Sequence, residues 1–130
     1  MAKLLLIDDD PVLLTLISKL LEKAGHTVTR AESAAECLSQ TATQTFDLII
    51  TDVMMPDLDG YQLTMRLRDQ VATRDTPILI LTSRLQGPDA ALARAAGASD
   101  YDMKSVNMER LGRKIENLLA ARLADHKADG

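Results

Sequence analysis

The chain alternates short, unbroken apolar runs with longer amphipathic stretches. Residues 4–7, 46–51 and 77–81 are the clearest strand candidates, with apolar runs at 4–7, 48–50 and 78–81. Unbroken apolar runs of this length are typical of strands buried on both faces of a parallel sheet. Residues 27–30 and 99–103 are weaker strand candidates, and the first of these is polar enough to lie at a sheet edge.

Between these runs, apolar residues recur at spacings of three and four, which predicts helices. The expected helices cover residues 12–24, 33–42, 61–71, 88–96 and 108–123. Asp10 and Asp59 stand where N-caps belong, and Ser33 with Glu36 has the spacing of a capping box. Residues 124–130 have no apolar face, so we expect a frayed tail.

Five strand–helix units in 130 residues indicate one doubly wound α/β domain. The sheet should be parallel, with helices on both faces, because each crossover connection is right-handed. We place this domain at residues 1–124 and a polar C-terminal tail at residues 125–130.

Polar residues follow the apolar runs at the points where ligands usually bind such a sheet. Asp8 and Asp9 follow the first run, Asp52 the third, Thr82 the fourth and Lys104 the fifth. The carboxyl ends of parallel strands share one edge, so these side chains should converge there.

Three converging carboxylates repel one another unless positive charge lies among them. Lys104 supplies one positive charge, and a divalent cation would supply two. Oxygen ligands without a neighbouring His or Cys favour Mg²⁺ or Mn²⁺ over Zn²⁺. The pattern therefore predicts a small Mg²⁺ site that handles phosphate.

Composition narrows the class of partner. The net charge is −4, and the chain has two Tyr, one Phe and no Trp. We therefore expect no direct nucleic-acid binding, which would need a basic face or stacking aromatics. No apolar run approaches the roughly 20 residues that span a bilayer, and the N-terminus lacks signal-peptide features, so a cytoplasmic location is expected. The single cysteine, Cys37, is expected to be a small buried hydrophobe.

The segments at these strand ends resemble a known family. They read Leu-Ile-Asp-Asp-Asp-Pro, Asp-Leu-Ile-Ile-Thr-Asp-Val-Met-Met-Pro-Asp-Leu-Asp-Gly, Ile-Leu-Thr-Ser and Ala-Gly-Ala-Ser-Asp-Tyr-Asp-Met-Lys. In this combination the chain is similar to the receiver domains of two-component response regulators, the flavodoxin-like, chemotaxis-Y-like switch proteins of phosphorelays. The resemblance runs from about Lys3 to Leu123 and implies the strand order 2-1-3-4-5.

The resemblance implies that Asp52 accepts a phosphoryl group from a phosphohistidine on a histidine kinase or phosphotransfer protein. Asp8, Asp9, Asp52 and the backbone carbonyl of Met54 would hold Mg²⁺. Lys104 would pair first with the Asp52 carboxylate and then with the phosphoryl group.

The resemblance also implies a two-state switch. Thr82 would hydrogen-bond the phosphoryl group, and Tyr101 would turn inward behind it. The surface formed by the fourth helix, fifth strand and fifth helix would change and regulate an unknown downstream protein. The protein would be a monomer or a phosphorylation-linked dimer, and it would be no enzyme beyond self-phosphorylation and self-dephosphorylation.

Three positions depart from the family pattern. Ser105 follows Lys104 where a cis proline is usual, so a trans peptide bond is expected, because a cis bond before Ser costs about 2.5–4 kcal/mol. Val106 stands where Phe is usual. Arg84 and Met54 lie where the family tunes phosphoryl lifetime, and our hypothesis is that both shield the acyl phosphate from water.

Two other functions remain open. Asp8 and Asp10 have the spacing of the nucleophile pair in haloacid-dehalogenase-like phosphatases. That motif usually continues with Gly-Thr or Gly-Val, whereas Pro11 follows here. A receiver-like adaptor that needs no phosphorylation is the other alternative.

A few residues receive structural interpretations. Arg66, Arg68 and Arg74 are expected to form a solvated helix face, and Asp57 to shape the loop after Asp52. His26 is expected to lie in a turn.

Overall fold

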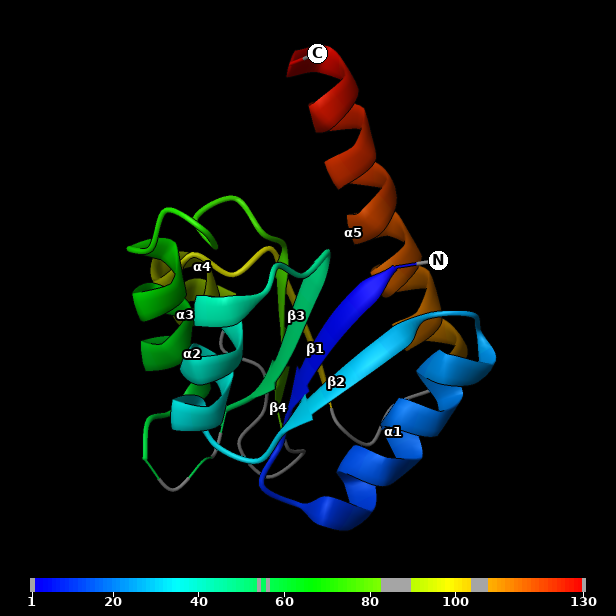
Figure 1. The fold of residues 1–130 in the computed structure, drawn as a ribbon, viewed down its shortest axis with the longest axis vertical. Coiled ribbons are helices and arrows are strands. Elements are labelled where there is room, and N and C mark those ends of the chain that lie inside the picture. Colours follow the sequence, from blue (N-terminus) through cyan, green and yellow to red (C-terminus); the bar gives the residue numbers. More distant parts are fainter. Residues whose placement is uncertain (1, 54, 56, 83–89, 104–107, 130) are drawn as a thin grey trace.

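The computed structural model describes residues 2–53, 55, 57–82, 90–103 and 108–129. They form a three-layer α/β domain in which one sheet is covered by helices on both faces (Figure 1). Among these residues, no helix combines the length and the apolar character that crossing a bilayer requires.

The sheet has five parallel strands in the order β2-β1-β3-β4-β5, so the expected fold class and strand order are confirmed. The strands are β1 (Lys3–Ile7), β2 (Thr27–Ala31), β3 (Leu48–Asp52), β4 (Ile78–Thr82) and β5 (Asp100–Met103). Every residue of β3 and β4 is buried, whereas β2 is partly exposed at one edge of the sheet, as its polar sequence predicted.

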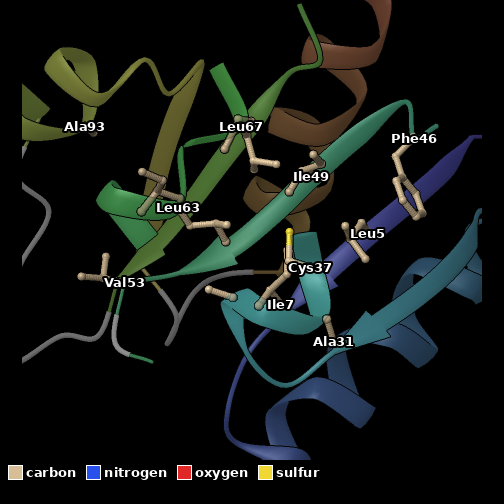
Figure 2. Packing of buried hydrophobic residues seen from close by; sticks show 13 residues of the cluster. Leu5, Ile7, Ala31, Cys37, Phe46, Ile49, Val53, Leu63, Leu67 and Ala93 are labelled. Atoms are coloured by element: carbon tan, nitrogen blue, oxygen red, sulfur yellow. The ribbon is translucent and has the colours of Figure 1, made fainter. Parts of the chain in front are cut away.

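The helices are α1 (Pro11–Lys23), α2 (Ala34–Thr43), α3 (Gly60–Arg68), α4 (Ala90–Ala96) and α5 (Met108–Asp129). Helices α1 and α5 cover one face of the sheet, and α2, α3 and α4 cover the other (Figure 1). Alternate strand residues point to opposite faces, which divides the core into two clusters. Figure 2 shows the cluster on the α2–α3–α4 face, where Cys37 packs beside β1 as a fully buried residue.

The helix starts follow the predicted caps with one difference. The Asp10 carboxylate accepts hydrogen bonds from the backbone N–H groups of Val12 and Leu13, and Asp59 forms a complete capping box with Gln62. At α2 the Ser33 hydroxyl accepts from the N–H of Glu36, as expected. The carboxylate in that box, however, accepts from the N–H of Glu32 instead of Ser33.

Two helix ends differ from the prediction by more than one residue. Helix α5 continues to Asp129, so the expectation of a frayed tail was wrong. The sequence after Gly112 has no further Gly or Pro before Gly130 and is rich in Ala, Leu, Lys and Arg, which favour helix. Helix α3 ends at Arg68, three residues early, and the chain then turns back over its end.

Arg68 is not part of a solvated face, and that prediction was also wrong. The guanidinium is half-buried and donates hydrogen bonds to the backbone carbonyls of Gly97, Thr73, Arg74 and Thr76. Gly97 has φ +101°, and a Cβ atom there would lie 2.9 Å from the Arg68 Cγ. The side chain therefore joins the end of α3 to the following turn and to the end of α4.

Candidate functional site

The three predicted carboxylates lie together at the carboxyl edge of the sheet. Asp8 follows β1 directly, and Asp52 is the last residue of β3. These strands are neighbours, and their register pairs Ile7 with Thr51, which brings the next residues of the two strands side by side. The strand order reverses direction at this pair, which is where ligands bind in open α/β sheets.

Carboxylate oxygens from Asp8, Asp9 and Asp52 all lie within 4.8 Å of one another. Asp8 and Asp52 are almost fully buried, with 2 % and 3 % of their surface exposed, whereas Asp9 is exposed. The site thus consists of two buried acids and one exposed acid.

Local hydrogen bonds fix this arrangement. The backbone N–H of Asp8 donates to the Ala31 carbonyl at 3.1 Å, which extends the β1–β2 pairing by one residue. One Asp8 carboxylate oxygen accepts from the N–H of Asp10 at 2.9 Å, which orients the side chain. The same Asp10 caps α1, so the acidic turn serves the site and the helix together.

Gly60 brings the start of α3 close to Asp52. Its N–H donates to the Val53 carbonyl at 2.8 Å. A Cβ atom on Gly60 would lie 2.3 Å from the Asp52 carbonyl oxygen, so a side chain at this position requires a backbone shift. Glycine here therefore lets α3 approach the end of β3.

Thr82 and Tyr101 lie on one face of the sheet, on adjacent strands. Thr82 ends β4 with 1 % of its surface exposed. The register pairs Tyr101 with Ile80, two residues before Thr82, so strand alternation points all three side chains toward the α2–α3–α4 face. Tyr101 is partly buried against the core cluster on that face.

Asp57 has a role that the sequence did not reveal. Its two carboxylate oxygens accept hydrogen bonds from the N–H groups of Ala34 and Ala35, at 3.1 and 2.9 Å, in the first turn of α2. Hydrogen bonds from Ala35, and also from Ala34 and Leu58, hold the pKa of Asp57 below its usual range, although burial opposes them. Asp57 therefore caps a helix that begins 23 residues earlier.

Three predicted site residues, Met54, Arg84 and Lys104, lie outside the described residues. The expected trans bond before Ser105 and the Val106 corner also lie there. The structure therefore brings together Asp8, Asp9 and Asp52 and places Thr82 and Tyr101 on neighbouring strands.

The donor set fits a hard divalent cation. It consists of carboxylate oxygens alone, which suit Mg²⁺ and Mn²⁺ and suit Zn²⁺ poorly. Two buried carboxylates so close together repel each other, and a bound cation relieves that repulsion. Within the part of the chain that the structure describes, this is the one group of three or more potential metal ligands.

Comparison with known proteins gives a consistent answer. A family model for the response regulator receiver domain matches residues 4–116. The chain is 33 % identical to the protein PilH of Pseudomonas aeruginosa over 120 residues, which is 92 % of this chain and 99 % of PilH. It spans half or less of the length of several other curated relatives that it matches.

Solved structures agree in fold. A putative response regulator from Chloroflexus aurantiacus superposes with a TM-score of 0.85 at 36 % identity, covering 92 % of this chain and 98 % of that one. The receiver domain of the sensor histidine kinase PA1611 from Pseudomonas aeruginosa, which has a magnesium ion coordinated in its active-site cleft, superposes with a TM-score of 0.83 at 30 % identity, with coverage of 92 % and 98 %.

The fold and the acidic site define a doubly wound α/β signalling domain of the two-component type. The chain belongs to the response regulator receiver domain family.

Proposed function

We propose that this protein is a phosphorylation switch in which Asp52 accepts a phosphoryl group in the presence of Mg²⁺. The donor is a phosphohistidine on a histidine kinase or a phosphotransfer protein. The observation that carries the proposal is the meeting of three carboxylates from two adjacent strand ends, with the buried Asp52 among them.

The chemistry asks the protein mainly for position and charge balance. One Asp52 carboxylate oxygen forms a bond to phosphorus while the phosphorus–nitrogen bond of the donor breaks, and the electron pair of that bond returns to the imidazole. The product is an acyl phosphate on Asp52. Burial at the end of a central strand holds the attacking oxygen in a fixed place before the donor arrives.

Asp8, Asp9 and Asp52 are the residues that would hold the cation, and the Met54 carbonyl is proposed to complete the protein ligands. Mg²⁺, when bound, offsets the negative charge that builds up on the transferring oxygens. Support comes from the oxygen-only donor set and from the magnesium ion in the PA1611 receiver domain. A second relative of known structure, TrrA from Thermotoga maritima, was crystallised with Mg²⁺ and beryllofluoride.

Phosphorylation adds negative charge and three hydrogen-bond acceptors to the site. We propose that Thr82 donates to one of those acceptors, that Lys104 pairs with another, and that Tyr101 follows Thr82. The shared sheet face of Thr82 and Tyr101 supports this coupling. The surface of α4, β5 and α5 then changes, which would regulate a downstream protein partner.

In this proposal the protein is an acceptor and not a turnover enzyme. Met54 and Arg84 would slow water attack on the acyl phosphate and so set the lifetime of the signal. Measured hydrolysis rates of phosphorylated Met54→Asn and Arg84→Ala proteins test this part, and rates equal to the unmodified sequence would contradict it.

The proposal is tested by incubating the protein with acetyl phosphate and Mg²⁺ and recording its intact mass. We expect a gain of one phosphoryl group, lost in Asp52→Asn and when EDTA replaces Mg²⁺. Asp69→Asn, which changes an exposed acid away from the site, is the control and should keep the gain. Labelling that persists in Asp52→Asn would overturn the assignment, and continuous turnover of a phosphomonoester would favour a phosphohydrolase instead.

A further inference from the structure

A lysine from α5 lies over the ring of Tyr101. The Lys114 Nζ donates a hydrogen bond to the Tyr101 carbonyl oxygen at 2.7 Å and lies 3.3 Å from a carboxylate oxygen of Asp100. The same ammonium lies 5.5 Å from the centroid of the Tyr101 ring, within the range of a cation–π interaction. Lys114 thus contacts the backbone and the ring of Tyr101 and the carboxylate of the preceding residue, Asp100.

These contacts pass around the edge of the sheet. Helix α5 covers the face opposite to the one that Tyr101 faces, and β5 is the last strand on its side. Lys114 reaches from one face to the other where β5 has no further neighbour. It therefore joins α5 to a side chain that otherwise belongs to the α2–α3–α4 face.

Packing alone does not fix the Tyr101 ring. The ring is only partly buried, and Tyr101 lines a small cavity of about 110 Å³ together with Ala93, Arg94, Ala98, Ser99 and Asp100. A side chain beside free volume has room for another rotamer. The ammonium over the ring, held in turn by Asp100 and the Tyr101 carbonyl, favours the present one.

We propose that Lys114 is a positioning residue that holds Tyr101 at the open edge of the sheet and so opposes its response to phosphorylation of Asp52. This inference rests on the proposed function, because it concerns the regulation of the same site. A contact that stabilises the resting position of Tyr101 lowers the affinity of any ligand that favours the other position, and it does so by the same factor. Lys114 thereby sets how much free energy phosphorylation of Asp52 must supply before Tyr101 changes position.

The test is a titration with beryllofluoride in the presence of Mg²⁺, which mimics a phosphoryl group on a carboxylate. Tyr61 and Tyr101 are the two tyrosines of the chain. In a Tyr61→Phe background the tyrosine emission therefore reports Tyr101 directly. We expect Lys114→Met to bind beryllofluoride about 2- to 5-fold more tightly, since a partly exposed cation–π contact is of that size. Lys114→Arg keeps a cation above the ring and should return toward the original affinity.

Two control variants separate this effect from simple loss of charge. Arg113→Met removes an exposed cation from the preceding position of α5. Lys3→Met removes a comparable cation–π contact, in which Lys3 Nζ lies 5.1 Å from the Phe46 ring centroid. This contact is at the amino end of β1, whereas the acidic site is at its carboxyl end. Neither should tighten binding.

Equal or weaker binding by Lys114→Met would overturn the inference while leaving the proposed function intact. A protein with Lys114 in place that binds no beryllofluoride would overturn both. Unchanged tyrosine emission on binding in the Tyr61→Phe background would show that the ring does not move, which would also overturn the inference.

Discussion

Replacing Arg68 by Met should destabilise the protein far more than its position near the surface suggests. Methionine keeps most of the aliphatic length of the arginine side chain but removes the guanidinium. The four carbonyls that accept hydrogen bonds from it, those of Gly97, Thr73, Arg74 and Thr76, then lose this donor together.

The size of the effect follows from these contacts. A hydrogen bond from a charged donor contributes about 1.5–3 kcal/mol, so four would sum to about 6 kcal/mol or more if none were compensated. Several effects reduce this sum. The Nη1 atom has two hydrogens for three of these carbonyls, and the Thr73 carbonyl also accepts a hydrogen bond from the Thr76 N–H at 3.1 Å. The contact to the Arg74 carbonyl is exposed, so water can replace the donor there. The guanidinium is also partly desolvated, and burial lowers the pKa of Arg68, so its removal ends that cost. We therefore expect a loss of about 3 kcal/mol, a large part of the roughly 5–15 kcal/mol typical of a domain.

Urea unfolding followed by circular dichroism measures this loss. With an m value of about 1.5 kcal/mol/M, the midpoint should fall by about 2 M. Arg66→Met is the matched control, because Arg66 is exposed on the same helix, and its effect should stay within about 0.5 kcal/mol. Arg68→Lys should be intermediate, since a single ammonium cannot serve all four carbonyls. Equal midpoints for Arg68→Met and Arg66→Met would refute the reasoning.

Two further substitutions test the surroundings of the acceptor. Gly60→Ala places a Cβ atom 2.3 Å from the Asp52 carbonyl oxygen, so it should lower both the urea midpoint and the extent of acetyl phosphate labelling, and wild-type labelling would contradict the packing argument. Asp57→Ala should cost about 1 kcal/mol at neutral pH, the usual size of a helix cap, and Ser33→Ala should cost a similar amount. The pKa of Asp57 is lower in the folded than in the unfolded protein, so its contribution is complete above the unfolded pKa and is lost as the pH falls through the folded one. Urea titrations of Asp57→Ala and the unmodified protein should therefore converge in acid, whereas Ser33→Ala should stay separate, and a constant gap for Asp57→Ala would argue against the cap.

The sheet was the most predictable part of the fold. Strands β1, β3 and β4 are buried on both faces. A strand buried on both faces needs consecutive apolar residues, so it can be recognised in the sequence as an unbroken apolar run. The convergence of Asp8, Asp9 and Asp52 followed from the rule that parallel strands end at one edge. These features depend on the order of elements along the chain, which a sequence displays directly.

Contacts made by polar side chains across the fold were not predictable. Arg68 and Asp57 look like ordinary surface charges, because their partners are backbone groups up to 29 residues away and leave no mark on the pattern. The length of α5 was underestimated for a different reason. The prediction required an apolar face, whereas residues 124–129 have none and include Ala124, Lys127 and Ala128, which intrinsically favour helix.

The strand order also bears on how the protein is made. Strands β1, β2 and β3 all lie within the first 52 residues, and β1 lies between β2 and β3 and pairs with both. A nascent chain can therefore assemble three of the five strands before β4 has been synthesised. Until then one side of β3, a strand with no exposed residue in the finished protein, remains an unpaired apolar edge of the kind that promotes aggregation. Once it has been synthesised, β4 pairs with this edge and so keeps the N-terminal half of the chain from associating with other copies.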